Sequence, residues 1–349
     1  MQPSVFLTRL IGLGAVFVAV PLSVHAQVNP NDDWNHFGLN FRAGFNIGAK
    51  FSEPSGSGPF GGGGAIPPGP SAGPDVNRRY NDGYVNVDSS GNGGGQTWNW
   101  GYDHPSQVSG QDLLMHANGP IEGGATGRTT DDPNLGIDFS YIRDIGHYKW
   151  GQWGIKFAFG YTPVEINDND PIGVTAENIT DTYLLGSVVA PTPPYTGSFN
   201  GPGPLLGSQP ISRSTSMGTE EITGNHRLDA ALYDWRVGPS FNILLAKRLS
   251  LQAGGGFALG LVDSDFTFNE NILTSSGRVS ASGGSTSTGL LPGAYAEAGL
   301  AYRFSHSMSV YGGAQFETLG NFHQTADGRT ACLDFSDMLF FELGLEFHF

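Results

Sequence analysis

The sequence is poor in cysteine and in cations, and each shortage excludes a class of protein. Cys332 is the only cysteine in 349 residues, which excludes an internal disulfide framework and any metal site built from several cysteines. Lysine and arginine number 17 against 32 aspartates and glutamates, a net charge of −15. Because phosphate contacts require Lys and Arg, we expect no nucleic-acid partner.

Long apolar runs are also missing once the first 26 residues are set aside. Residues 1–26 resemble a secretory signal, with Arg9 in the basic region, an apolar stretch from Leu10 to Val20, and a small-residue cleavage site at 24–26. In the remaining chain, 27–349, no segment approaches the roughly 18 uninterrupted apolar residues of a membrane-spanning helix. The sequence therefore predicts an exported chain without a transmembrane helix.

Glycine, proline and aromatic residues are abundant instead. Glycine (53) and proline (22) together make about a fifth of the chain, and aromatics make 12%. Glycine and proline penalise helix interiors, whereas so many aromatics supply the apolar surface that a disordered chain lacks. The composition predicts a β-rich protein with long irregular loops.

An alternation of apolar with small or polar residues is the clearest pattern in the sequence. It runs through FGLNFRAGFNIGAKF at 37–51, where every odd position is apolar. Successive side chains of a strand point to opposite faces, so this segment predicts a strand with one apolar face. Seven further segments repeat the pattern, which gives eight strands near 35–51, 134–144, 152–163, 229–243, 249–261, 290–304, 308–320 and 337–349.

The residues on the second face distinguish a membrane barrel from a soluble sandwich. A sandwich turns its polar face to bulk water and carries many Lys, Glu and Thr residues there. Here that face is largely Gly, Ser and Asn with isolated charges of both signs, which suits a narrow interior. We therefore predict an all-β fold, an eight-stranded antiparallel transmembrane β-barrel, over 27–349.

The connections between these strands alternate between long and short. Segments 52–133, 164–228, 262–289 and 321–336 are long, whereas the turns at 145–151, 244–248 and 305–307 are short. Bacterial outer-membrane barrels have short periplasmic turns and long extracellular loops. Both chain ends are therefore predicted on the periplasmic side, with large loops outside the cell.

The chain resembles the small bacterial outer-membrane β-barrels of the OmpA and OmpX kind. The signal, the eight alternating strands and the terminal segment MLFFELGLEFHF carry the resemblance. It implies that Leu343, Leu345, Phe347 and Phe349 form the signal read by the barrel-assembly machinery. It also implies a monomer in the bacterial outer membrane, in contact with its lipid. The long outer loops lie outside the resemblance.

Charged residues on the polar face form the first candidate site. The inward cations are expected to be Arg42, Lys50, Lys156, Arg236 and Arg303, and the inward acids Asp138, Asp234, Glu297, Glu317, Glu342 and Glu346. Buried charges must be paired or hydrated. We expect a salt-bridged plug in which Arg42 and Arg236 meet Glu297, Glu317, Glu342 or Glu346; a gated ion path would use the same residues.

The first long loop offers aromatic side chains. Trp98, Trp100 and Tyr102 either bind a sugar or partner or pack the loop onto the barrel rim, and 84–88 is expected to pair with 96–102 as a hairpin. The segment APTPPYTGSFNGPGPLL in the second loop favours a compact covering loop. The sequence leaves the extracellular ligand open.

No catalytic or metal-binding motif stands out. His226 lies near Asp229, and His104 and His116 lie in the first loop, but these residues show no nucleophile, general-base or ligand spacing. We therefore expect no enzyme activity, no cofactor and no metal, and treat Cys332 as an incidental thiol. The predicted function is a structural or surface-interaction scaffold with large extracellular loops; the alternative is a narrow channel for ions or small solutes.

Overall fold

The computed structural model describes residues 34–53, 66–274 and 277–349, so the predicted signal at 1–26 lies outside the described residues. Among these residues, no helix has the length and apolar content needed to span a membrane. The described elements are strands, apart from the short 3-10 turns η1 (Pro70–Ala72), η2 (Gly93–Gly95) and η3 (Pro105–Gln107). The prediction of an all-β fold is confirmed.

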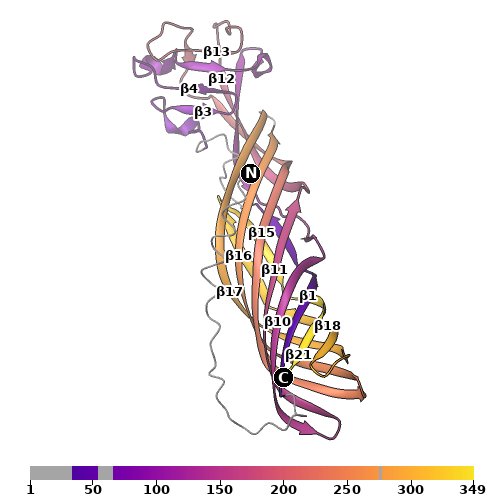
Figure 1. The fold of residues 1–349 in the computed structure, drawn as a ribbon. Helices are drawn as coiled ribbons and strands as arrows, with labels where there is room; N and C mark the ends of the chain where they lie inside the picture. Colours follow the sequence, from indigo (N-terminus) through magenta and orange to yellow (C-terminus); the bar gives the residue numbers. More distant parts are fainter. Residues whose placement is uncertain (1–33, 54–65, 275–276) are drawn as a thin grey trace.

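Eight antiparallel strands form a ring (Figure 1). In ring order they are β1 (Asn35–Phe45), β10 (Asn134–Tyr148), β11 (Gly151–Asp168), β15 (Ser212–Ala246), β16 (Leu249–Thr274), β17 (Gly277–Arg303), β18 (Met308–Thr318) and β21 (Met338–His348). The ring is completed where the first strand pairs with the last, with Phe37 opposite Phe347 and Phe41 opposite Leu343. The predicted barrel of eight strands is confirmed.

The outer surface of the ring carries an apolar belt. Phe41, Phe257 and Leu343 are 75%, 73% and 64% exposed, although each is large and apolar. The residues that alternate with them are polar and buried, as Arg42 and Glu342 illustrate. An apolar outside and a polar inside are what a barrel needs in lipid.

Further along the same strands this pattern reverses. In β16, Phe257 and Leu259 face outward, but beyond them Val262 and Phe266 are buried inside while Asp265 is exposed outside. The reversal marks the border at which the surroundings of the ring change from lipid to water. Beyond that border the outer face contacts water and can be polar. The inner face, which alternates with it, can therefore be apolar.

The strands consequently run further than the sequence predicted. β15, expected at 229–243, begins at Ser212, and β16, expected to end near 261, continues to Thr274. β11 likewise continues to Asp168 and buries Val164 and Ile166. The prediction placed strand ends where the alternation of outward apolar residues stopped. Strand pairing continues beyond those positions, so much of the sequence predicted as loop is strand.

The first predicted strand, 35–51, is in fact two strands. β1 ends at Phe45, and β2 (Gly48–Ser52) belongs to another sheet. Between them Asn46 has a φ of 62°, a left-handed conformation that asparagine tolerates better than most residues. The chain turns inward there, so Phe51 is buried rather than lipid-facing, and Lys50 is exposed rather than inside the lumen.

A small sheet fills the ring above the membrane. Its order is β19 (Gly320–Ala326), β20 (Arg329–Phe335), β2 and β9 (Thr129–Thr130). β18 ends at Thr318 and β19 begins at Gly320, whose φ is +80°, so the predicted strand 308–320 ends early. Apolar side chains of this sheet pack against the inner faces of β11, β15 and β16, and the core includes Phe51, Phe335, Leu228 and Phe266.

A head projects beyond the ring (Figure 1). The upper part of β15 pairs with β12 (Ile172–Leu184), which pairs with β8 (Asp112–Glu122), and β7 (Val108–Ser109) completes this extension. A second sheet has the order β13 (Tyr195–Thr196), β6 (Trp100–Tyr102), β4 (Gly83–Val85) and β3 (Arg78–Tyr80), and β14 (Leu206–Gly207) pairs with β5 (Gln96–Thr97).

The head has its own apolar core. Trp100 and Tyr102 are buried there with Met115, Ile179 and Tyr183. The expected pairing of the two halves of the first loop occurs, with Val85 opposite Trp100. These aromatics pack the head itself, so neither of the roles expected for Trp100 and Tyr102, sugar binding or packing on the barrel rim, fits their positions.

The border between lipid and water can be tested with two substitutions on one face of β16. Phe257→Arg should lower the free energy of unfolding by about 2–4 kcal/mol if Phe257 lies near the bilayer midplane. Thr267→Arg, on the same outward face but above the border, should change it by less than about 0.5 kcal/mol. Urea unfolding in lipid vesicles measures both, and equal losses would contradict the border.

Candidate functional site

Most of the predicted lumen residues lie in the membrane-level interior of the ring, and Arg303 lies at its periplasmic end. Arg42, Lys156 and Arg236 are buried on the inner faces of β1, β11 and β15. The four predicted glutamates, Glu297, Glu317, Glu342 and Glu346, also have inward-facing side chains, on β17, β18 and β21. Arg303 lies lower, at the periplasmic end of β17.

Two arginines form a compact cluster with aspartates rather than with the glutamates we expected. Arg42 forms an ion pair with Asp234 through two nitrogens and donates from Nε to Thr162 Oγ1 at 2.8 Å. Arg236 forms an ion pair with Asp138 and places Nε 2.9 Å from Asp234 Oδ2. Glu342, at 3.8 Å from Arg236 Nη1, is the expected partner that comes nearest.

Strand tilt explains this difference. The alternation assigns each charge to the inner face but leaves its height in the barrel unassigned. In a barrel the strands are tilted and staggered, so side chains of one level come from different strands. Asp138 and Asp234 are thereby brought to the two guanidinium groups, whereas Glu297 meets Lys156.

Lys156 and Glu297 form a second, separate pair. The ammonium nitrogen Nζ lies 2.8 Å from each carboxylate oxygen, and the two side chains are 5% and 7% exposed. This pair links β11 to β17 across the ring interior. Because both groups are withdrawn from water, removing one would leave the other buried without its counter-charge.

Two further inward acids, Glu317 and Glu346, have amide partners. Gln315 donates to Glu317 at 2.7 Å, and Gln252 donates to Glu346 at 2.8 Å. Three cations (Arg42, Lys156 and Arg236) thus face six acids (Asp138, Asp234, Glu297, Glu317, Glu342 and Glu346) at these levels. The cluster carries more carboxyl groups than its cations can balance.

The periplasmic end of the ring holds a histidine-rich cluster. Arg303 Nη2 lies 3.2 Å from His348 Nδ1, and His36 contacts both His348 at 2.7 Å and Asp144 at 2.8 Å. A cavity of about 250 Å³ opens beside it, lined by basic residues that include Lys149, Lys247 and Arg248. Arg303 therefore belongs to this end cluster and not to the central ion pairs.

The predicted assembly residues lie on the last strand, which also completes the ring. Leu343 and Leu345 are exposed on the lipid side of β21, Phe347 is half-buried, and Phe349, directly after β21, is exposed. The backbones of Phe349 and Asn35 exchange hydrogen bonds at 3.0 and 3.1 Å. The terminal strand thus combines apolar outward residues with the pairing that joins the two ends of the sheet.

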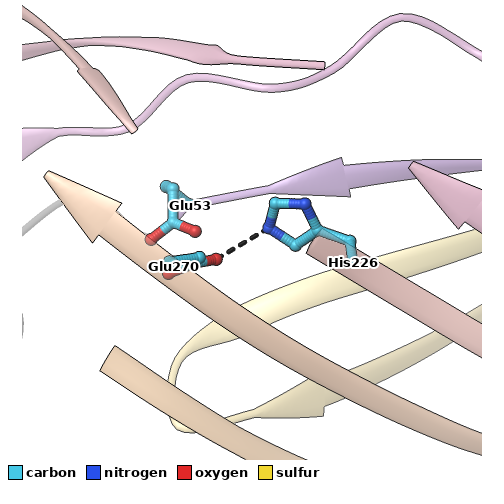
Figure 2. A group of neighbouring side chains, drawn as sticks. All are labelled: Glu53, His226 and Glu270. Carbon is cyan, nitrogen blue, oxygen red and sulfur yellow. Dashed lines mark hydrogen bonds and ion pairs between the residues drawn. The ribbon is translucent and has the colours of Figure 1, made fainter. Parts of the chain in front are cut away.

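Sequence reasoning missed a buried cluster above the membrane (Figure 2). Glu53 follows β2, His226 lies on β15 and Glu270 on β16, the three side chains drawn in Figure 2. Arg329 lies on β20, and all four residues are buried. His226 Nε2 lies 2.7 Å from Glu270 Oε1. Arg329 Nε lies 3.0 Å from Glu270 Oε2 and 3.4 Å from Glu53 Oε2.

The cluster is buried beside aromatic side chains. The ring of Phe51 stacks on His226 at 5.2 Å, and the guanidinium of Arg329 lies 4.5 Å above the ring of Phe268. Burial and the neighbouring negative charge of Glu270 raise the pKa of Glu53 to about 8, against the effect of Arg329. Burial opposes ionisation of Glu270, but the hydrogen bond from His226 and the charge of Arg329 hold its pKa below the ordinary value.

The sequence did contain a signal for this cluster. His226 appeared to be a neighbour of Asp229, but Asp229 pairs with Arg227 at 2.9 Å on the outer side of the strand. His226 is on the inward-facing side of β15, together with the buried Leu228. Glu270 is on the inward-facing side of β16. Continuing the alternation past the lipid border would have identified both as inward polar residues in an apolar interior.

The ring, its apolar belt and the polar lumen together decide where the protein resides. It is a β-barrel of the outer membrane. Neither a family model nor a curated protein sequence matches the chain.

Solved outer-membrane proteins are similar to this chain at low sequence identity. The outer membrane protease OmpT of Escherichia coli is 9% identical, with 94% of this chain and 100% of that chain covered and a TM-score of 0.33. The outer membrane protein OprG of Pseudomonas aeruginosa is 7% identical, with 89% and 96% covered and a TM-score of 0.29.

Ail, the attachment invasion locus protein of Yersinia pestis, solved with the heparin analogue sucrose octasulfate, is 10% identical, with 90% and 99% covered and a TM-score of 0.28. At such identities and TM-scores, none of these similarities bears on activity or ligand.

The central ion pair predicts a coupled loss of stability. Glu297→Gln should lower the free energy of unfolding by about 3–5 kcal/mol, because Lys156 stays buried without its counter-charge. Combining it with Lys156→Met should cost less than the sum of the two single changes. Urea unfolding in vesicles measures this cycle, and Glu317→Gln, which retains an acceptor for Gln315, is the control with a much smaller loss. Additive losses would show that the pair is hydrated.

The terminal strand predicts a defect in biogenesis. Deleting Phe349, or Phe349→Asp, should reduce insertion into the outer membrane while leaving transport across the inner membrane intact. Fractionation of cells followed by heat-modifiability on gels measures the folded barrel. Phe304→Asp, just beyond the end of the internal strand β17, is the matched control and should insert. Normal outer-membrane levels of the Phe349 deletion and of Phe349→Asp would refute a terminal assembly signal.

Proposed function

We propose that the protein is a non-enzymatic scaffold that holds a folded head outside the cell for surface interactions. The observation that supports it best is the filling of the ring. Ion-paired side chains occupy the membrane level, and an apolar core occupies the level above. A barrel filled at both levels has little room for a solute path.

The structure of the head supports the same proposal. Arg78 is buried and donates to the backbone carbonyls of Pro68, Ser208 and Gly73, at 2.8, 2.8 and 2.7 Å. Arg213 holds Asp181 through two hydrogen bonds of 2.7 Å. Such contacts bring together segments far apart in the sequence, so the head presents a defined surface rather than a set of mobile loops.

Exposed apolar residues on the head indicate where a partner would bind. The connection between β12 and β15 carries Val189, which is 88% exposed, together with the exposed Phe199 and Ile211. Over 66–130 and 169–211 there are nine Asp and Glu but three Arg and no Lys. An acidic head repels polyanions, so we infer a neutral or basic partner surface. Each ring strand pairs with two neighbours in the same chain, which suits a monomer.

A narrow channel is the alternative function. The excess of carboxyl groups in the lumen and the basic cavity of about 250 Å³ at the periplasmic end favour it. Such a path would pass the Arg42–Asp234 and Arg236–Asp138 pairs and would also need an opening in the apolar core above them.

Planar-bilayer recording separates the two functions. The purified full-length protein should give no reproducible conductance steps, because the ring is filled at two successive levels. A general porin added to the same bilayer verifies that steps are detectable. Reproducible steps from this protein that change size in the Lys156→Met variant would overturn the scaffold proposal in favour of the channel.

A further inference from the structure

We propose that Glu53, His226 and Glu270 bind one divalent transition-metal ion of the zinc class inside the extracellular part of the barrel. The proposal is independent of the scaffold function, because it concerns what fastens the inner sheet to the ring. The three residues come from β16, β15 and the segment after β2, and they meet only in the folded chain (Figure 2).

The distances suit a single ion. One potential ligand atom from each of the three residues lies within 4.8 Å of the others, and His226 Nε2 and Glu270 Oε1 are already 2.7 Å apart. Zinc–nitrogen and zinc–oxygen bonds of about 2.0–2.2 Å place tetrahedral ligand atoms roughly 3.4 Å apart. Small side-chain adjustments would bring the three atoms to that spacing.

An oxygen of Glu53 provides a second, independent observation. The side chain of Glu53 is 2% exposed, yet its Oε1 has no hydrogen-bond partner among the described residues. Its carboxylate points toward that of Glu270, as Figure 2 shows. A buried carboxylate oxygen without a donor is costly, and a cation between the two carboxylates would satisfy it.

Arg329 orients the two glutamates. Its guanidinium contacts the Oε2 atoms of both, at 2.9 Å from Glu270 and 3.4 Å from Glu53. Glu270 Oε1 therefore faces His226, and Glu53 Oε1 has no hydrogen-bond partner among the described residues. Hydrogen bonds to the outer oxygens of ligating carboxylates commonly set ligand direction, and Arg329 is placed to do this.

The ligand set and the surroundings favour zinc over calcium. One imidazole nitrogen and two carboxylate oxygens suit a four-coordinate transition metal, whereas calcium takes six to eight oxygens. The chain supplies three ligand atoms here, so one water would complete a four-coordinate zinc site, whereas calcium would need at least three further oxygens. Burial also closes the site to substrates, so we assign the ion a structural role that joins the inner sheet to the wall of the ring.

The alternative is a cluster that needs no metal. With Glu53 protonated, as its raised pKa favours, the charge of Glu270 would be balanced by that of Arg329. In that case the purified protein would contain no stoichiometric metal, and added zinc would not stabilise it. The two arrangements therefore differ in measurable composition and not only in interpretation.

The experiment uses the full chain extracted from outer membranes without chelator. Elemental analysis should find about one equivalent of zinc, or of another first-row transition metal, and EDTA should remove it. After EDTA, the midpoint of thermal unfolding should fall by several degrees and return on adding zinc. Glu53→Gln and His226→Gln should each lose at least nine-tenths of the bound metal and the zinc-dependent shift.

His323→Gln is the matched control, because His323 is exposed on β19 of the same inner sheet. It should retain both the metal and the shift. If His226→Gln fails to fold, Glu53→Gln, which keeps the shape of the side chain, still tests the site. Less than a tenth of an equivalent of metal in the wild-type protein, together with no shift on adding zinc, manganese or iron, would overturn the proposal.

Discussion

The width of an eight-stranded ring governs the rest of this structure. Its interior has room for side chains and little else, so whatever points inward must fit and be compensated there. The surroundings of the ring decide which residues those are. In lipid the outer face must be apolar, and the inner face that alternates with it is polar. In water the outer face need not be apolar. On β16, whose Phe257 faces lipid, Val262 and Phe266 therefore point inward.

One continuous ring therefore encloses two different interiors. The lower one is held by ion pairs between distant strands, such as Lys156 with Glu297. The upper one is an ordinary hydrophobic core, completed by a small sheet that the chain folds into the ring after Asn46 and after Gly320. β15 runs through both and continues into the head, so the head is attached through paired strands rather than by flexible linkers.

In both interiors a buried polar group needs a partner, but the partners differ. At the membrane level Arg42 and Arg236 share Asp234, and each also contacts a further polar group. In the upper interior His226, two glutamates and Arg329 converge within an apolar core, and one oxygen of Glu53 has no hydrogen-bond partner among the described residues. Ligand atoms of Glu53, His226 and Glu270 lie within 4.8 Å of one another there, and our inference of a metal ion rests on that convergence.

The sequence by itself determined which face each strand presents to lipid, the number of ring strands and the residues that the last strand displays outward, because these properties depend only on alternation along the chain. It did not determine the height of any residue in the barrel, which depends on strand tilt and stagger. The partners of Arg42 and Arg236, and the meeting of His226 with Glu270 across 44 residues, were decided by tertiary structure alone. The folded head and inner sheet, expected to be loops, also depend on long-range pairing that no local pattern encodes.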